Sequence, residues 1–112
     1  MCGESALMEI IETPIFTKRI CELLSDEEYR ELQRILIVNP KAGSVIPSSA
    51  GLRKIRWRCS GRGKSGGLRV IYYLYTRDKK IYMLLPYEKS DQEDLTKEQL
   101  KILVKTVKDG LL

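Results

Sequence analysis

The first third of the chain places its apolar residues at the spacing of amphipathic helices. A short apolar stretch at residues 8–12 predicts a strand, and Thr13-Pro14 after it is typical of a helix start. The apolar residues that then share one helical face are Ile15, Phe16, Ile20, Leu23 and Leu24. Ser25 and Glu28 form a capping box that opens a second helix, and Asn39-Pro40 ends it. The apolar stripe of this second helix is Tyr29, Leu32, Ile35 and Leu36.

Beyond a predicted loop at residues 39–51, the period of the pattern changes to two. Residues 52–59 alternate strictly, so they predict a strand with two different faces. One face carries Ile55, Trp57 and Cys59, and the other carries Lys54, Arg56 and Arg58. The glycine-rich residues 60–67 then lead to a second predicted strand at 68–76. A turn at Arg77-Asp78 leads to a third strand at 79–87.

The last predicted element is a helix over residues 96–109. Thr96 and Gln99 form its capping box, Leu95 and Leu100 are spaced as a hydrophobic staple, and Gly110 is placed to stop it. The resulting order is β-α-α-β-β-β-α, an α+β fold. Short turns between successive strands predict an antiparallel sheet with the two N-terminal helices on one face. We expect residues 1–7 to be a flexible extension and residues 8–112 to form a single domain.

Charge is segregated along this pattern. Between Leu32 and Arg77 there is no Asp or Glu, although this segment contains ten of the 20 basic residues. All 15 acidic residues therefore lie outside it. Such a concentration of positive charge predicts a partner rich in phosphate, such as RNA or DNA.

The composition excludes several kinds of chemistry. The chain has no histidine, so a Ser-His-Asp or Cys-His site cannot form within it, and we expect no metal and no cofactor. No apolar run is long enough to span a bilayer, and the N-terminus lacks the pattern of a secretory signal. We therefore expect a cytoplasmic protein without a membrane partner. Its three cysteines should be reduced, with Cys21 and Cys59 buried.

Residues 61–66 match the glycine pattern of dinucleotide-binding loops by coincidence. Such a loop must open a helix after a strand, whereas this one is predicted to open another strand. The segment also lacks the first glycine of a P-loop, because residue 58 is Arg58. We interpret it as a hairpin tip whose cations, Arg62 and Lys64, grip phosphates.

The basic face of the first central strand is the strongest candidate site. Lys54, Arg56 and Arg58 repel one another, and no acidic residue lies fewer than twenty positions from them in the sequence. A solvated strand face is the ordinary alternative, but such a face usually mixes charges of both signs. We therefore favour phosphate binding. Clustered cations could also support RNA cleavage, because they lower the pKa of a lysine and stabilise a phosphorane.

Residues 39–73 and 81–99 resemble the RelE/HigB branch of bacterial toxin–antitoxin toxins. The most specific parts are residues 51–57 and 63–73, and the resemblance extends over residues 8–107. It implies an α+β, RelE-like microbial RNase fold and a metal-independent mRNA endoribonuclease (an mRNA interferase). Such a toxin cuts mRNA in the A site of the 70S ribosome, leaves a 2′,3′-cyclic phosphate and inhibits translation. It also implies a cognate antitoxin, expected to be a helix-turn-helix protein.

The resemblance further implies which residues act. The implied catalytic residues are Lys54, Arg56, Arg69 and Lys89, with Tyr87 in place of a family tyrosine at the position of Leu95. The residues expected to bind RNA are Arg53, Arg58, Arg62 and Lys64. Two alternatives stay open: a gyrase-poisoning toxin of the related ParE branch and an RNA-binding module without catalysis.

Overall fold

The structure is a computed structural model of the 112-residue chain and describes residues 8–57 and 67–111. Its centre is a five-stranded sheet in the order β1-β5-β4-β3-β2. The strands are β1 (Glu9–Glu12), β2 (Ser44–Val45), β3 (Leu52–Trp57), β4 (Leu68–Tyr75) and β5 (Lys80–Glu88). Strands β2 to β5 pair antiparallel, whereas β1 pairs parallel with β5.

Three α-helices begin where the sequence places their caps. They are α1 (Pro14–Leu23), α2 (Asp26–Val38) and α3 (Lys97–Thr106). The side chains of Thr13, Ser25 and Thr96 accept the N-terminal backbone N–H groups of α1, α2 and α3, respectively. The helix α3 continues directly into one turn of π-helix, Val107–Leu111.

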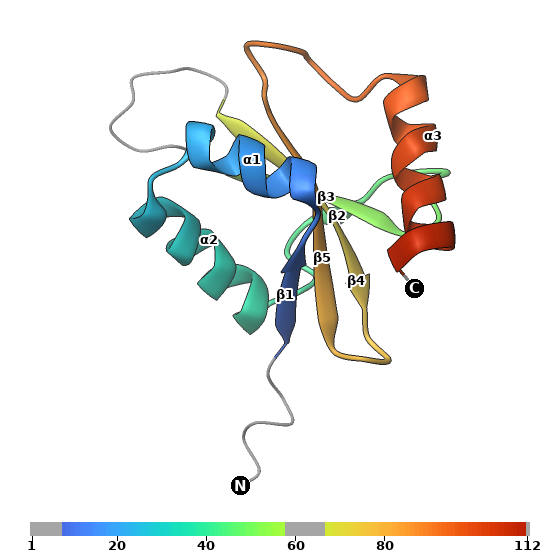
Figure 1. Cartoon of the computed structure of the whole chain (residues 1–112), viewed down its shortest axis with the longest axis horizontal. Helices are drawn as coiled ribbons and strands as arrows, with labels where there is room; N and C mark the ends of the chain where they lie inside the picture. The colour runs from blue at the N-terminus through green and yellow to red at the C-terminus, as the bar shows by residue number, and fades with distance from the viewer. Residues whose placement is uncertain (1–7, 58–66, 112) are drawn as a thin grey trace, which may run out of the picture.

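The helices cover opposite faces of the sheet: α1 and α2 lie on one face and α3 on the other (Figure 1). On the first face, Phe16, Leu32 and Leu36 pack against Val70 and Met83. On the second, Leu103 and Val107 belong to a cluster with Leu52, Ile71 and Leu84. Each face therefore has its own apolar core, and only the parts of the sheet that the helices leave open can carry a site.

The α+β class and the order of the predicted elements are confirmed, with differences in detail. β2 was predicted as loop; only two residues long, it leaves no alternating pattern to detect. The three central strands are antiparallel as predicted, and the first strand, whose direction was not predicted, pairs parallel with β5. Gly110 does not stop the last helix, because the π-helical turn runs through it to Leu111.

The prediction for the cysteines was wrong for Cys21, which is exposed on α1. Its position lies off the apolar stripe formed by Phe16, Ile20 and Leu24. Cys59 and the predicted extension at residues 1–7 lie outside the described residues. Within residues 8–57 and 67–111, no helix has the length and apolar character needed to cross a lipid bilayer.

The segment before β2 is bonded to the α1–α2 face of the sheet. The buried hydroxyl of Tyr72 donates to the carbonyl of Pro40 at 2.7 Å and accepts the backbone N–H of Gly43 at 2.9 Å. Arg53, opposite Tyr72 on β3, donates from its guanidinium to the carbonyl of Gly43 at 2.7 Å. Three hydrogen bonds thus hold residues 40–43 beside the strand that carries Lys54.

Candidate functional site

Three predicted site residues lie side by side on three adjacent strands. Arg56 on β3 is directly opposite Arg69 on β4, and Arg69 is directly opposite Tyr87 on β5. Directly opposite residues in antiparallel strands share a face and have Cβ atoms about 5 Å apart. The register therefore gathers two arginines and a tyrosine from distant parts of the sequence into one row.

This row lies on the α3 face of the sheet, at the end where β3 and β5 finish and β4 begins. Arg69 is buried, with 6% of its surface exposed, and Tyr87 is buried with 1% exposed. Arg56, by contrast, is exposed. Lys54 lies two residues before Arg56 on the same face, and 28% of its side chain is exposed. An anion arriving from solvent can therefore meet Lys54 and Arg56 first, with Arg69 behind them.

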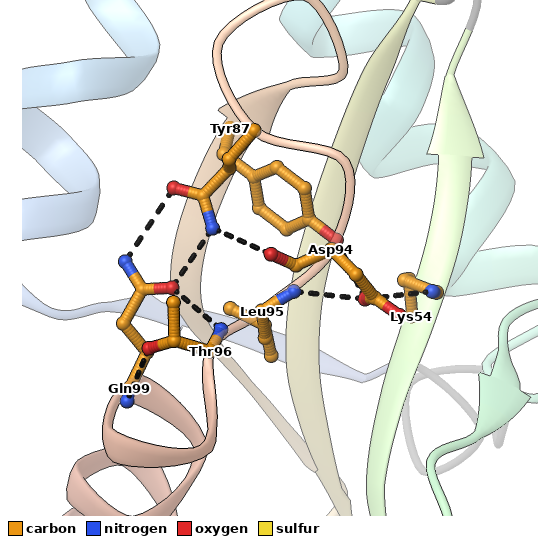
Figure 2. Close-up of polar contacts among 7 residues, drawn as sticks. Lys54, Tyr87, Asp94, Leu95, Thr96 and Gln99 are labelled. Atoms are coloured by element: carbon orange, nitrogen blue, oxygen red, sulfur yellow. Dashed lines mark hydrogen bonds and ion pairs between the residues drawn. The ribbon is translucent and has the colours of Figure 1, made fainter.

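An acidic residue that the sequence pattern did not reveal completes the site. Asp94, in the segment between β5 and α3, accepts from the Lys54 ammonium at 3.3 Å and from the Tyr87 hydroxyl at 3.4 Å (Figure 2). The basic strand was predicted to lack a counter-charge because no acid lies near it in the sequence. The fold supplies one from 40 residues away. No local signal could have identified it, since the contact depends on where the chain returns after β5.

The start of α3 holds Asp94 in place (Figure 2). The Asp94 carboxylate accepts a hydrogen bond from the backbone N–H of Leu95 at 2.8 Å. The backbone carbonyl of Asp94 accepts one from the side-chain amide of Gln92 at 2.9 Å. Gln92 also donates to Gln99 at 2.8 Å, and Gln99 closes the capping box with Thr96. Hydrogen bonds thus tie Asp94 to the first turn of α3, which begins three residues later at Lys97.

These contacts change the acidity of two groups. Burial, with the Asp94 charge and hydrogen bond adding to it, raises the pKa of Tyr87 to about 12, although nearby Arg69 opposes the shift. The Leu95 N–H, and after it Lys54 and the Tyr87 hydroxyl, lower the pKa of the Asp94 carboxyl. At neutral pH Tyr87 is thus a neutral phenol that can donate a proton, and Asp94 is an anion.

The other predicted site residues are distributed differently. Lys89 is exposed just beyond β5, where its backbone N–H donates to Gly67 at 3.1 Å, so it lies at the same end of the sheet. Arg53 lies on the opposite face, where it bonds Gly43. The structure therefore separates Arg53 from Lys54 and Arg56. The predicted RNA-binding residues Arg58, Arg62 and Lys64 lie outside the described residues.

The tyrosines of β4 lie outside the row of Arg56, Arg69 and Tyr87. Tyr72 is in the core of the α1–α2 face. Tyr73 and Tyr75 lie on the α3 face with their rings stacked, with centroids 6.4 Å apart, but they belong to the far end of β4. Six residues of strand separate Tyr75 from Arg69, which is about 20 Å. Base stacking beside the arginines would therefore need another group.

Among residues 8–57 and 67–111, no group of three or more His, Cys, Asp or Glu side chains is placed to hold a metal ion. What the site does contain is two arginines, a lysine, a protonated phenol and a carboxylate. Such groups can bind an anionic phosphoryl group and move protons.

No known family profile matches this sequence. Among solved structures, the chain is similar to the E. coli toxin RelE, in the form of a double arginine-to-alanine mutant in the free state. The two share 16% sequence identity at a TM-score of 0.62, over 94% of this chain and 99% of that one. At this level of identity the similarity concerns architecture. The chain has the α+β fold of RelE.

Proposed function

We propose that this protein is the toxin of a bacterial toxin–antitoxin module and that it cuts mRNA in the ribosomal A site. The observation that carries the proposal is the row Arg56–Arg69–Tyr87, with Lys54 beside it, on a RelE-like fold. The sequence resemblance to the RelE/HigB branch supports the same reading. The proposal includes action in the cytoplasm and inhibition by a cognate antitoxin.

The proposed chemistry is transfer of the phosphoryl group to the neighbouring 2′-oxygen. The 2′-hydroxyl gives its proton to solvent water as its oxygen attacks phosphorus, and the bond to the 5′-oxygen breaks. The products are a 2′,3′-cyclic phosphate and a 5′-hydroxyl, which takes up a proton. The negative charge that develops on the phosphoryl oxygens is stabilised by Lys54, Arg56 and Arg69.

Tyr87 and Asp94 have different proposed parts in this reaction. With a pKa of about 12, Tyr87 holds its proton at neutral pH and suits donation to the leaving 5′-oxygen. Asp94 is a weak base, because its pKa is lowered; we assign it to holding Lys54 and Tyr87 in position. A site with no strong base depends on accurate placement of the 2′-hydroxyl, which the ribosome would provide.

The proposal is tested with purified protein, mRNA and ribosomes. Cleavage should appear only when ribosomes are present, and its products should end in a 2′,3′-cyclic phosphate. DNA breaks in a gyrase assay would support the ParE alternative instead. Ribosome binding with intact mRNA would support a non-catalytic RNA-binding module.

Arg69→Ala tests the role of the buried arginine. Loss of a contact made to the transition state should slow single-turnover cleavage about 10²- to 10³-fold. Arg77→Ala is the matched control, since it removes the same charge from the exposed turn after the far end of β4. Because Arg69 is buried, Arg69→Lys is measured as well. This variant keeps the charge but loses the bidentate fork, so it should fold and still be slow. Wild-type rates in a folded Arg69→Ala protein would refute the assignment.

A further inference from the structure

One flank of α3 carries a row of exposed lysines that the proposed cleavage site does not use. Lys97, Lys101 and Lys105 follow one another at four-residue spacing, which places them on the same side of the helix. Lys108 follows in the π-helical turn, and all four are exposed. Together they form a positive strip about 16 Å long, from the helical rise per residue.

Two acids lie one helical turn from lysines of this strip, Glu98 from Lys101 and Asp109 from Lys105, but neither makes a close ion pair with them. Among the described residues, no carboxylate lies within 4.0 Å of any of these four ammonium groups. The strip therefore carries four ammonium groups against two nearby carboxylates and presents a net positive charge to solvent.

The strip also borders a hollow. Lys101, Lys105 and Lys108 line a cavity of about 320 Å³ together with Ser48, Val104 and Asp109. Three ammonium groups thus meet one carboxylate around a concave surface. In Figure 1, the segment between β2 and β3 passes beside the C-terminal half of α3, where this hollow lies.

We propose that this lysine strip, residues 97, 101, 105 and 108, binds the phosphate backbone of a folded RNA. Lysine is a compact, strongly hydrated point charge, which suits phosphates arranged along a strand. Protein–protein interfaces, by contrast, are depleted in lysine and enriched in aromatic residues and arginine. A strip of this length can follow several successive phosphates of one strand.

The strip lies beside the proposed cleavage site without being part of it. It begins at Lys97, three residues after Asp94, whose carboxylate contacts Lys54. RNA bound along α3 would therefore hold the protein with Lys54 and Arg56 toward the neighbouring strand to be cut. This orientation rests on the proposed function. The proposed site would then contact the mRNA, and the lysine strip would contact the structured RNA of the ribosome.

The test is the triple variant Lys101→Gln/Lys105→Gln/Lys108→Gln, chosen because glutamine keeps the helix propensity of lysine. Affinity is measured for vacant ribosomes and for a short RNA duplex between about 50 and 200 mM salt. The matched control, Lys18→Gln/Arg30→Gln/Arg77→Gln, removes the same charge from exposed positions outside α3. A Lys→Arg triple at the three α3 positions keeps the charge, and circular dichroism confirms that every variant is folded.

The α3 variant should bind both RNAs roughly 10- to 100-fold more weakly at about 150 mM salt. Its affinity should also depend less on salt, with a slope of log affinity against log salt that is less negative by about 2 to 3. The control and the arginine triple should stay close to wild type. Equal losses in the α3 variant and the control would overturn the proposal. So would unchanged RNA binding with weakened binding to polyglutamate, which would indicate an acidic protein partner instead.

Failure of this inference can be told from failure of the proposed function. If wild-type protein cuts no mRNA on ribosomes but the α3 variant loses duplex affinity, the strip is an RNA site and the cleavage proposal is wrong. If wild-type protein cleaves normally and the α3 variant matches the control, the strip proposal alone is wrong.

Discussion

Gly43→Ala should destabilise the protein through a purely steric effect beside the candidate site. A Cβ atom at position 43 would lie 2.8 Å from Cε1 of Tyr72, 2.9 Å from the Tyr72 hydroxyl and 2.9 Å from the backbone carbonyl of Lys54. Carbon atoms pack favourably at about 3.5–4.0 Å, so all three contacts are strongly repulsive. The Lys54 carbonyl belongs to a strand and cannot move alone, and the Tyr72 ring is fully buried.

The size of this destabilisation follows from the overpacking and from the displacement of Tyr72. Overpacking of this kind costs about 1–3 kcal/mol. Displacement of Tyr72 also weakens its hydrogen bonds to Pro40 and Gly43, each of which contributes about 0.5–1.5 kcal/mol net. The free energy of unfolding should therefore fall by about 2–4 kcal/mol.

Urea unfolding monitored by circular dichroism measures this change. Ala42→Ser is the control, because it adds one atom to the exposed neighbouring residue, and it should change the free energy by less than about 0.5 kcal/mol. Tyr72→Phe gives a second check. It removes the crowded hydroxyl, so the cost of Gly43→Ala should be at least about 0.5 kcal/mol smaller in that background. A Gly43→Ala protein as stable as wild type would refute the steric argument.

Three further predictions concern the site and its support. Asp94→Asn should change the free energy of unfolding by less than about 1 kcal/mol, because the Lys54–Asp94 pair is partly exposed. The same variant should reduce the rate of single-turnover cleavage. An unchanged rate would mean that Asp94 does not position Lys54 or Tyr87. Trp57→Ala should lower the free energy of unfolding by about 2–4 kcal/mol. This loss is toward the low end of the values for large aromatic side chains, because Trp57 is half-buried. A urea midpoint equal to that of the wild type would contradict the prediction. Folding raises the pKa of Tyr87 from 10.0 to about 12. Tyr87 in the unfolded chain therefore ionises at a lower pH than in the folded protein. The stability that this difference provides is complete below pH 10 and is lost between pH 10 and 12. In Tyr87→Phe, the decrease in the free energy of unfolding between pH 10 and 12 should be smaller than in the wild type by about 2–3 kcal/mol. An equal decrease in both proteins would show that folding does not raise the pKa of Tyr87.

Local patterns in the sequence predict most of the fold. The capping residues Ser25 and Thr96 and the proline at position 14 set the helix starts, because they act through hydrogen bonds within one turn. The period-two pattern in β3 correctly places Ile55 against the α1–α2 core and leaves Lys54 and Arg56 on the other face. Arg53 follows the same rule, since alternation alone puts it on the face of Ile55.

The remaining features depend on contacts that no local pattern records. Asp94 meets Lys54 across 40 residues of sequence, and its position follows from the route of the chain into α3. Parallel pairing of β1 with β5 depends on where α1 and α2 return the chain, and alternation within β1 carries no information on strand direction. The row Arg56–Arg69–Tyr87 likewise needs the register of three strands.

The pairing of β1 with β5 has a consequence for the order in which the nascent chain can fold. Glu9 pairs with Lys80 and Glu12 with Met83, and the backbone N–H of Thr13 donates to the carbonyl of Met83. The first strand must therefore wait until β5, the last strand of the described sheet, has left the ribosomal exit tunnel. Until then α1 and α2 lack the β5 side chains Ile81 and Met83, against which they pack. Contacts so distant along the chain slow folding, because a long loop must close before they form. The row Arg56–Arg69–Tyr87 needs β5 as well, so a chain whose β5 is still inside the tunnel cannot carry the assembled row.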